Sequence, residues 1–304
     1  MKFVHFIQYL IVVGFWYLYR LIPLRYAYRF GSGFGKLCYF LGSASRRVKV
    51  TRDNLIITGI AKTQKEANAI ARASWGHFFG HVFEAFRAVG VVTHENWRQY
   101  VELDLSPAAE KLLFSAERPV ILATGHLGAW EAGIVAISSA RPFFAVARLM
   151  DNPYLQRFLD KHNFRCGATI IPKRNGFTAK AMHQWLDSNG ALTILFDQFS
   201  SRGAKVKFFG HVVPAYTSPV RIHLRSHAPL LVGGFLRTGH MKYKLIVVGE
   251  PIEYVEGDVS EERIQQLTAE LIARLEKVIL QAPEQYLWMH RRWRNIPVPE
   301  VPKK

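Results

Sequence analysis

The sequence predicts an α/β fold: a mostly parallel central sheet flanked by helices, with an N-terminal membrane-anchoring helix. From residue 119 onward, short apolar runs alternate with helical segments, and this order is typical of a parallel sheet. Hydrophobic residues make up 49% of the 304 residues, which is enough for a substantial core. Residues 3–24 are almost entirely apolar and aromatic, and this segment predicts the anchor.

The predicted anchor covers residues 1–30, and a globular domain covers residues 31–304. The uninterrupted apolar stretch from Tyr9 to Tyr19 is too short to span a bilayer, while residues 3–24 reach about the 20 residues that a span needs. Arginines and lysines are frequent from residue 20 to residue 52, so this side is expected to face the cytoplasm. A buried core helix is the alternative. The next segment, "GSGFGK" (31–36), is interpreted as a flexible break, because it follows no strand and fits a dinucleotide-binding loop poorly.

The chain is strongly basic, with a net charge of +17 and a pI of about 10.0. This charge indicates an acidic partner: nucleic acid, an anionic membrane surface or an acidic protein. The sequence contains no nucleic-acid-binding motif. Candidate contact residues are Arg221, Arg225, Arg237, Lys242, Lys244, Arg291, Arg292 and Arg294. The two cysteines and the scattered histidines predict neither a disulfide framework nor a metal site.

The predicted elements of the domain follow from local patterns. Residues 64–90 are expected to be helical, with His77 and His81 filling a packed face rather than binding a metal. Strands are predicted at 119–125, 142–148, 168–172, 191–197, 228–237 and 242–252, with helices after the first three. Residues 208–219 are expected to form a loop, although their apolar residues could equally belong to the core. Residues 260–281 predict an amphipathic helix with Ser260 as its N-cap.

Polar side chains follow the first four predicted strands. They are His126 after the first, Arg148, Asp151 and Asn152 after the second, Lys173 and Arg174 after the third, and Asp197 and Gln198 after the fourth. The carboxyl ends of adjacent parallel strands meet at one edge of a sheet, where ligands bind. We therefore expect these side chains to line one site.

Within this set, His126 and Glu131 could form a base and its partner. Five residues correspond to about 140° on a helix, so the pair requires His126 in the loop and Glu131 in the first turn of the helix. A carboxylate there could hold the imidazole in the tautomer that leaves its other nitrogen free as a base. The helix N-terminus and Arg148 could stabilise an oxyanion. The spacing alone is weak evidence.

Several blocks strengthen this interpretation. The segments "TGHLGAWEAG", "VARLMDNPYLQRF", "IIPKRNG", "LFDQ" and "PEQYLWMHRRW" occur in this order. Together they resemble the bacterial lipid A biosynthesis acyltransferases, the late lauroyl/myristoyl transferases of the lysophospholipid acyltransferase superfamily. The resemblance extends over almost the whole chain. It implies that residues 31–304 form an acyltransferase domain, with His126 and Glu131 as the catalytic pair and with Arg148, Asp197 and Gln198 at the family's other site positions.

The resemblance implies an enzyme at the bacterial inner membrane that faces the cytoplasm and uses no cofactor. It would transfer an acyl chain from acyl carrier protein or acyl-CoA to a hydroxyl of a lipid A precursor or a related glycolipid. Two alternatives remain open. The acceptor could be a phosphatidylinositol mannoside or a lysophospholipid, or the protein could be a basic membrane-attached binding protein in which His126 and Glu131 are dispensable.

Overall fold

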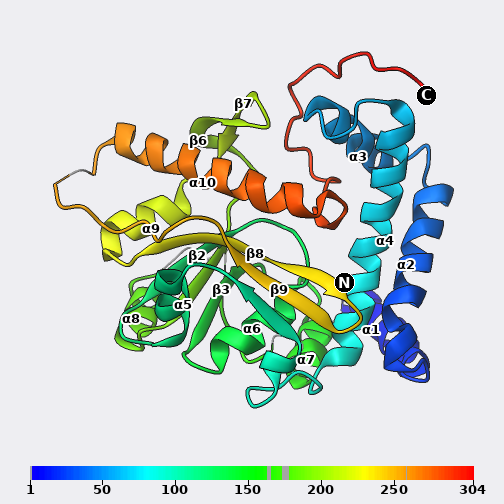
Figure 1. Cartoon of the computed structure of the whole chain (residues 1–304). Helices are drawn as coiled ribbons and strands as arrows, with labels where there is room; N and C mark the ends of the chain where they lie inside the picture. Colours follow the sequence, from blue (N-terminus) through cyan, green and yellow to red (C-terminus); the bar gives the residue numbers. More distant parts are fainter. Residues whose placement is uncertain (1, 163–165, 173–177, 258) are drawn as a thin grey trace.

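A computed structural model of the chain describes residues 2–162, 166–172, 178–257 and 259–304. Its centre is a seven-stranded sheet with the order β1-β9-β8-β2-β5-β3-β4 (Figure 1). The parallel strands are β2 (Val120–Thr124), β3 (Phe143–Ala147), β4 (Thr169–Pro172), β5 (Ala191–Leu195) and β8 (Leu230–Gly239). β9 (Lys242–Val247) and β1 (Val101–Asp104) run in the opposite direction. The predicted mostly parallel sheet is confirmed.

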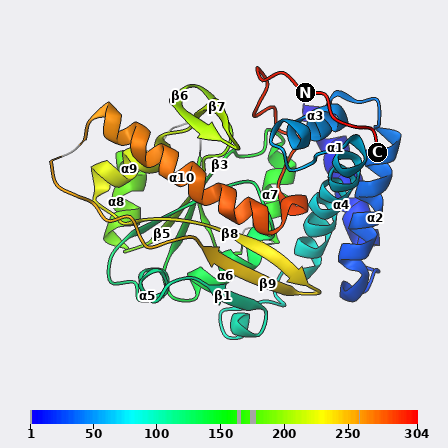
Figure 2. The same cartoon turned by 45° about the horizontal axis from the view of Figure 1, so that its top comes forward.

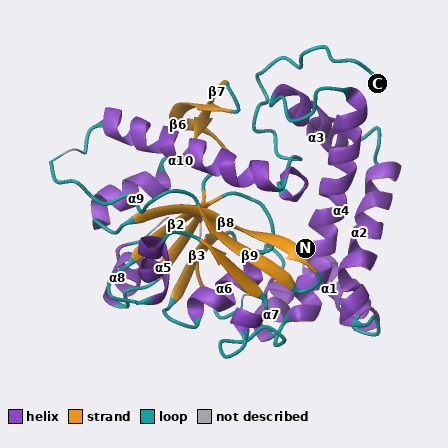
Figure 3. Ribbon diagram, viewed as in Figure 1, coloured by secondary structure: helices purple, strands orange, loops and turns teal. Residues whose placement is uncertain are grey.

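The sheet is buried on both faces, as a parallel sheet must be when helices cover it. Strand β2 shows this directly, because successive side chains of a strand point to opposite faces. Ile121 and Ala123 belong to one hydrophobic cluster, and Val120 and Leu122 belong to the other. The first cluster includes α10 (Glu261–Gln281), and the second includes α5 (Pro107–Phe114) and α6 (Trp130–Ser138). Strand and helix layers therefore alternate around the centre (Figure 3).

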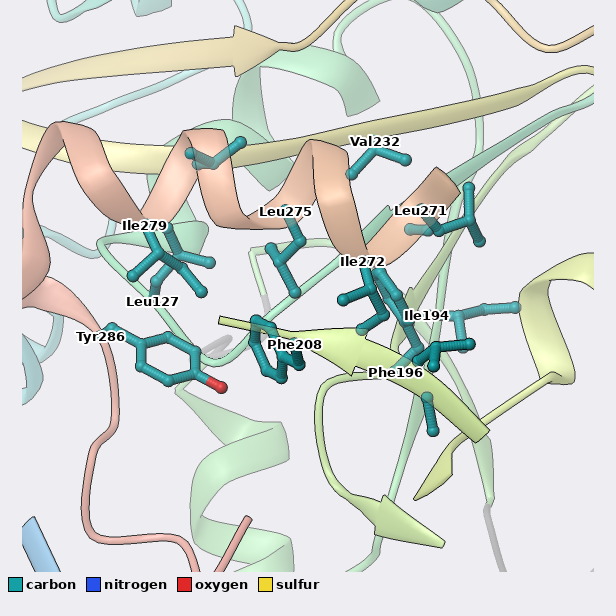
Figure 4. Packing of buried hydrophobic residues seen from close by; sticks show 14 of the residues in the cluster. Leu127, Ile194, Phe196, Phe208, Val232, Leu271, Ile272, Leu275, Ile279 and Tyr286 are labelled. Atoms are coloured by element: carbon teal, nitrogen blue, oxygen red, sulfur yellow. The ribbon is translucent and has the colours of Figure 1, made fainter. Parts of the chain in front are cut away.

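Helix α10 covers the first face along its length. The side chain of Ser260 accepts a hydrogen bond from the backbone N–H of Arg263, which confirms Ser260 as the N-cap. Leu271 and Leu275 are fully buried and belong to the same cluster as Phe196 and Val232, which Figure 4 shows beside this helix. The remaining helices of the domain are α7 (Pro153–Lys161), α8 (Ala179–Asp187) and α9 (Ser218–Ser226).

Four N-terminal helices form a layer at one side of the sheet (Figure 2): α1 (Lys2–Tyr19), α2 (Leu24–Leu41), α3 (Arg46–Ile57) and α4 (Gln64–Ala88). The expectation of a flexible break at residues 31–36 is wrong, because this segment lies inside α2. A Cβ atom on Gly35 would lie 2.3 Å from the carbonyl oxygen of Trp75, and one on Gly31 would lie 2.6 Å from that of Phe79. These glycines let the backbones of α2 and α4 approach closely.

The N-terminal membrane anchor is not confirmed. Within the described residues, no helix combines the length and the apolar composition that a bilayer crossing requires. Helix α1 packs on the domain: the Tyr19 hydroxyl donates to the carbonyl of Phe83 at 2.6 Å. The boundary expected between residues 30 and 31 falls inside α2.

Residues 208–219 also differ from the expected loop. Residues 211–215 form β7 (His211–Ala215), which pairs with β6 (Phe199–Phe208) in an antiparallel hairpin outside the main sheet. Phe208 and Val213 are buried in the first hydrophobic cluster, so the apolar residues of this segment belong to the core.

Candidate active site

His126 lies in the loop that connects β2 to α6. The loop is fixed at several points: the N–H of Leu287 donates to the carbonyl of His126 at 2.9 Å, and the N–H of Ala129 donates to the carbonyl of Phe235 at 2.6 Å. Gly128 adopts a positive φ of 68°, and a Cβ atom there would lie 1.7 Å from the Phe235 carbonyl oxygen. Only glycine fits at this position. The backbone therefore holds His126 at the carboxyl end of β2, as the sequence predicted.

Asp197 orients the imidazole of His126. It follows β5, the strand that pairs in parallel with β2, so the two strand ends bring the residues together. Its Oδ1 lies 2.7 Å from Nδ1 of His126, and its Oδ2 accepts a hydrogen bond of 2.9 Å from the backbone N–H of His126. Because an ionised carboxylate only accepts hydrogen bonds, Nδ1 carries the proton and Nε2 carries the lone pair.

The surroundings of Asp197 keep it ionised although the side chain is only 3% exposed. Burial raises its pKa, but the charge of His126 and the hydrogen bonds from His126 and Tyr286 lower the pKa to about 2. A buried carboxylate with such partners is available to stabilise an imidazolium on His126. The His126 side chain is 27% exposed, so the pair combines an accessible base with a buried acid.

Gln198 and His290 complete this cluster. The side-chain nitrogen of Gln198 lies 3.3 Å from Nε2 of His126 and 3.2 Å from Nε2 of His290. His290 belongs to the segment 285–293, here called the C-terminal strap. The backbone of the strap pairs with the loop that contains His126. The buried side chain of Arg292 donates to the carbonyls of Gln198 and Pro214 at 2.5 and 2.9 Å.

Glu131 lies in the first turn of α6, as expected, but it has a different partner. Its Oε2 is 2.8 Å from Nε2 of His81 on α4. Burial lowers the pKa of His81, but the charge and hydrogen bond of Glu131 and the charge of Glu84 together outweigh this effect and raise the pKa. The expectation that Glu131 orients His126 is corrected, since Asp197 occupies Nδ1 of His126. Sequence spacing did not reveal this because Asp197 is 71 residues away and only the pairing of β2 with β5 brings it close.

The residues after β3 have mixed environments. Arg148 and Asp151 are 67% and 61% exposed and form an ion pair with each other. Asn152 is buried and caps α7 by accepting from the N–H groups of Tyr154 and Leu155. Its amide nitrogen donates to the carbonyl of His5 in α1 at 2.8 Å. These contacts favour a structural role for Asn152. Lys173 and Arg174 lie outside the described residues.

Of the predicted surface arginines, Arg237 is partly buried and Arg292 is buried. Arg237 donates to both carboxylate oxygens of fully buried Glu84, at 2.7 and 2.9 Å, and Arg292 is 1% exposed. The interpretation of these two as contacts for an anionic partner is wrong, because each neutralises or caps groups inside the fold. Among the described residues no cluster of potential ligands could hold a metal ion.

Comparison with known proteins identifies the family of the chain. The model of the family described as bacterial lipid A biosynthesis acyltransferase matches residues 1–295. The chain belongs to this family. This is the family that the ordered sequence blocks predicted, so that prediction is confirmed.

Curated relatives match part of the chain. The lipid A biosynthesis palmitoleoyltransferase of Escherichia coli (strain K12) and the lipid A biosynthesis acyltransferase of Shigella flexneri are each 26% identical over 187 residues. This stretch covers 60% of the chain and 58% of each relative, which is less than two thirds of their length. Among solved structures, the 1-acyl-sn-glycerophosphate acyltransferase PlsC of Thermotoga maritima aligns with 83% of this chain and 97% of its own. Its identity is 14% and its TM-score is 0.36.

Sequence analysis missed the roles of Tyr286, His290 and Arg292. The segment "YLWMHRRW" contributed to the resemblance, but no periodicity or spacing placed it beside His126. A possible signal was its density of aromatic and basic residues after the last helix, which is unusual for an exposed terminus. The strap is far from the His126 loop in sequence: the 2.9 Å hydrogen bond from the N–H of Leu287 to the carbonyl of His126 joins residues 161 positions apart.

Proposed function

We propose that the protein transfers an acyl chain from a thioester donor to a hydroxyl of a lipid A precursor or a related glycolipid, with His126 as general base. The observation that carries this proposal is the contact between Nδ1 of His126 and buried, ionised Asp197 at 2.7 Å. It gives the imidazole the tautomer that a base requires, with the lone pair on Nε2. Family membership supports the reaction type.

The reaction follows from this geometry. Nε2 of His126 accepts the proton of the acceptor hydroxyl while the hydroxyl oxygen attacks the thioester carbonyl. The tetrahedral intermediate then collapses, the carbon–sulfur bond breaks, and the imidazolium returns its proton to the leaving thiolate. Asp197 stabilises the imidazolium during both steps. Arg148, Asp151 and Gln198 remain proposed substrate contacts at the mouth of the site.

Two kinds of evidence support the proposed donor and acceptor. The names of the Escherichia coli and Shigella relatives support a fatty acyl group as the transferred group and a lipid A precursor as the acceptor. The net charge of +17 suits acyl carrier protein or the phosphates of acyl-CoA as the donor. A cavity of about 290 Å³ is lined by aliphatic side chains, including Ala85, Val89 and Val135, and by polar ones, including His81 and Glu131. It offers space for part of an acyl chain.

We further propose that α1 and α2 attach the protein to the inner-membrane surface, with the site facing the cytoplasm. Both helices expose large apolar side chains: Phe3, Leu10, Ile11, Leu18, Leu21, Phe34, Leu37, Phe40 and Leu41 are each more than 40% exposed. Arg25 and Arg29 are exposed on the same helix pair. A surface that combines apolar and basic residues matches an interfacial helix on anionic lipid.

The test measures acyl transfer in membranes that contain the wild-type chain, His126→Ala or a control, His183→Ala, whose histidine is exposed on α8. Acyl carrier protein and CoA thioesters are the donors, a lipid A precursor and a lysophospholipid panel are the acceptors, and mass spectrometry detects the products. Loss of at least about 10²-fold in His126→Ala alone is expected for removal of a general base. Full activity of His126→Ala would refute the assignment, and transfer only to a lysophospholipid would replace the acceptor.

A further inference from the structure

The amide of Gln198 lies between two histidines. Its nitrogen is 3.3 Å from Nε2 of His126 and 3.2 Å from Nε2 of His290, and the two ring centroids are 5.3 Å apart. An amide nitrogen carries two hydrogens, so it can donate to both rings at once. This arrangement links a second histidine to the base through one side chain.

The direction of these hydrogen bonds follows from Asp197. Since Nδ1 of His126 donates to Asp197, Nε2 of His126 is an acceptor and the Gln198 nitrogen is its donor. The same nitrogen also faces Nε2 of His290, which must then accept and carry no proton. If Gln198 were reversed, its oxygen would face the lone pair of His126 Nε2, which is repulsive. The contacts therefore require a neutral His290.

The groups around His290 keep it neutral. Burial lowers its pKa, and the charges of His126, Arg47 of α3 and Arg292 lower it further, while Asp197 acts in the opposite direction. The net shift is downward from 6.5, so His290 is unprotonated at neutral pH.

Backbone contacts hold both His290 and Gln198 in place. Asn54 of α3 donates to the carbonyl of His290 at 2.7 Å, and the N–H of Arg292 donates to the same carbonyl at 2.8 Å. The guanidinium of Arg292 donates to the carbonyl of Gln198. The fold thus holds His290 and Gln198 from their main chains and leaves both side chains to face each other.

We propose that His290 is a positioning residue for the base, which acts through Gln198. This inference rests on the proposed function of His126. While the site is empty, the Gln198 amide donates to Nε2 of His126 and holds the lone pair ready. When the acceptor hydroxyl arrives, it takes the place of the amide at Nε2. The Gln198 amide then keeps its hydrogen bond to Nε2 of His290, which is the acceptor. It therefore does not compete with the hydroxyl for Nε2 of His126.

Two substitutions of His290 separate this role from simple packing. His290→Phe keeps a planar ring but provides no acceptor, whereas His290→Gln places an oxygen near the position of Nε2. Each is measured alone and in a Gln198→Ala background, with kcat/KM for the acceptor as the readout and the thermal midpoint as a control for folding. His126→Ala is included in the same assay.

We expect His290→Phe to lower kcat/KM about tenfold, the loss associated with one hydrogen bond, and His290→Gln to restore most of it. In the Gln198→Ala background, His290→Phe should cause no further loss, because residues that act through one another are not additive. Additive losses, or a His290→Gln variant as impaired as His290→Phe, would overturn the inference. If His126→Ala kept full activity, the proposed function itself would fail. If His126→Ala were inactive and His290→Phe were unaffected, only the positioning role of His290 would be rejected.

Discussion

The substitution Asp197→Asn tests the assignment of the acid that orients the base. Asp197 uses one oxygen for the backbone N–H of His126 and the other for Nδ1. Asparagine has a single oxygen, and the backbone N–H cannot change, so the oxygen stays there and the amide NH₂ turns toward Nδ1. Nδ1 must then accept, and the proton moves to Nε2. The variant therefore keeps the shape of the site but loses the lone pair that the reaction needs.

The pKa of Asp197 indicates the order of magnitude of this effect. The partners of Asp197 lower its pKa from 3.8 to about 2, which corresponds to about 2 kcal/mol, or a factor of several tens in rate. The wrong tautomer adds to this loss. In other histidine–carboxylate pairs the same change costs up to about 10⁴-fold. We expect kcat to fall by about 10²- to 10⁴-fold.

The assay is the transfer reaction described above, measured at saturating donor so that kcat is isolated. Glu131→Gln makes the same chemical change at the acid that pairs with His81, and Asp187→Asn makes it at an exposed position of α8. The loss in Glu131→Gln should be smaller than that in Asp197→Asn, and Asp187→Asn should match the wild type. An inactive Glu131→Gln beside an active Asp197→Asn would refute the structural assignment and restore Glu131 as the partner.

The same variant changes the pH dependence of stability. The pKa of Asp197 is lower in the folded chain than the ordinary value of 3.8, so its contribution is fully present above that value and is lost as the pH falls toward about 2. Denaturant midpoints measured between pH 6 and pH 2.5 should decline less steeply in Asp197→Asn than in the wild type. Equal declines would show that this carboxylate is not stabilised by folding.

Two further predictions concern the N-terminal helices. Gly35→Ala places a Cβ atom 2.3 Å from the Trp75 carbonyl oxygen, and we expect the free energy of unfolding to fall by about 1–3 kcal/mol, as for overpacking. The control Gly33→Ala, whose Cβ meets nothing within 4 Å, should not lower the midpoint of a thermal melt. Replacing Phe3, Leu10 and Leu21, which are 74%, 51% and 80% exposed, by serine should weaken binding to anionic vesicles in a flotation assay by at least tenfold, at about 25 cal/mol per Å² of apolar surface. Unchanged flotation would refute membrane attachment through α1 and α2.

Several elements of the fold could be predicted from the chain because their signals are local. The apolar run 120–124 bounded by Gly125, and the amphipathic stripe capped by Ser260, each contain their own start and end signals. The segment 31–36 misled because its glycines indicate a break when considered alone. These glycines instead let the backbone of α2 approach Trp75 and Phe79 of α4. A local sequence pattern does not reveal such a contact.

The sequence by itself determined the α/β class, the position of His126 at a strand end, and the family, since these depend on local periodicity and on ordered motifs. The tertiary structure decided which acid serves His126. Glu131 is near in sequence but turns with α6 toward His81, whereas Asp197 arrives through the pairing of β5 with β2. The C-terminal strap and His290 likewise reach the site only through long-range contacts. Hydrogen bonds act over about 3 Å in space, and the chain alone does not specify which distant residues come that close.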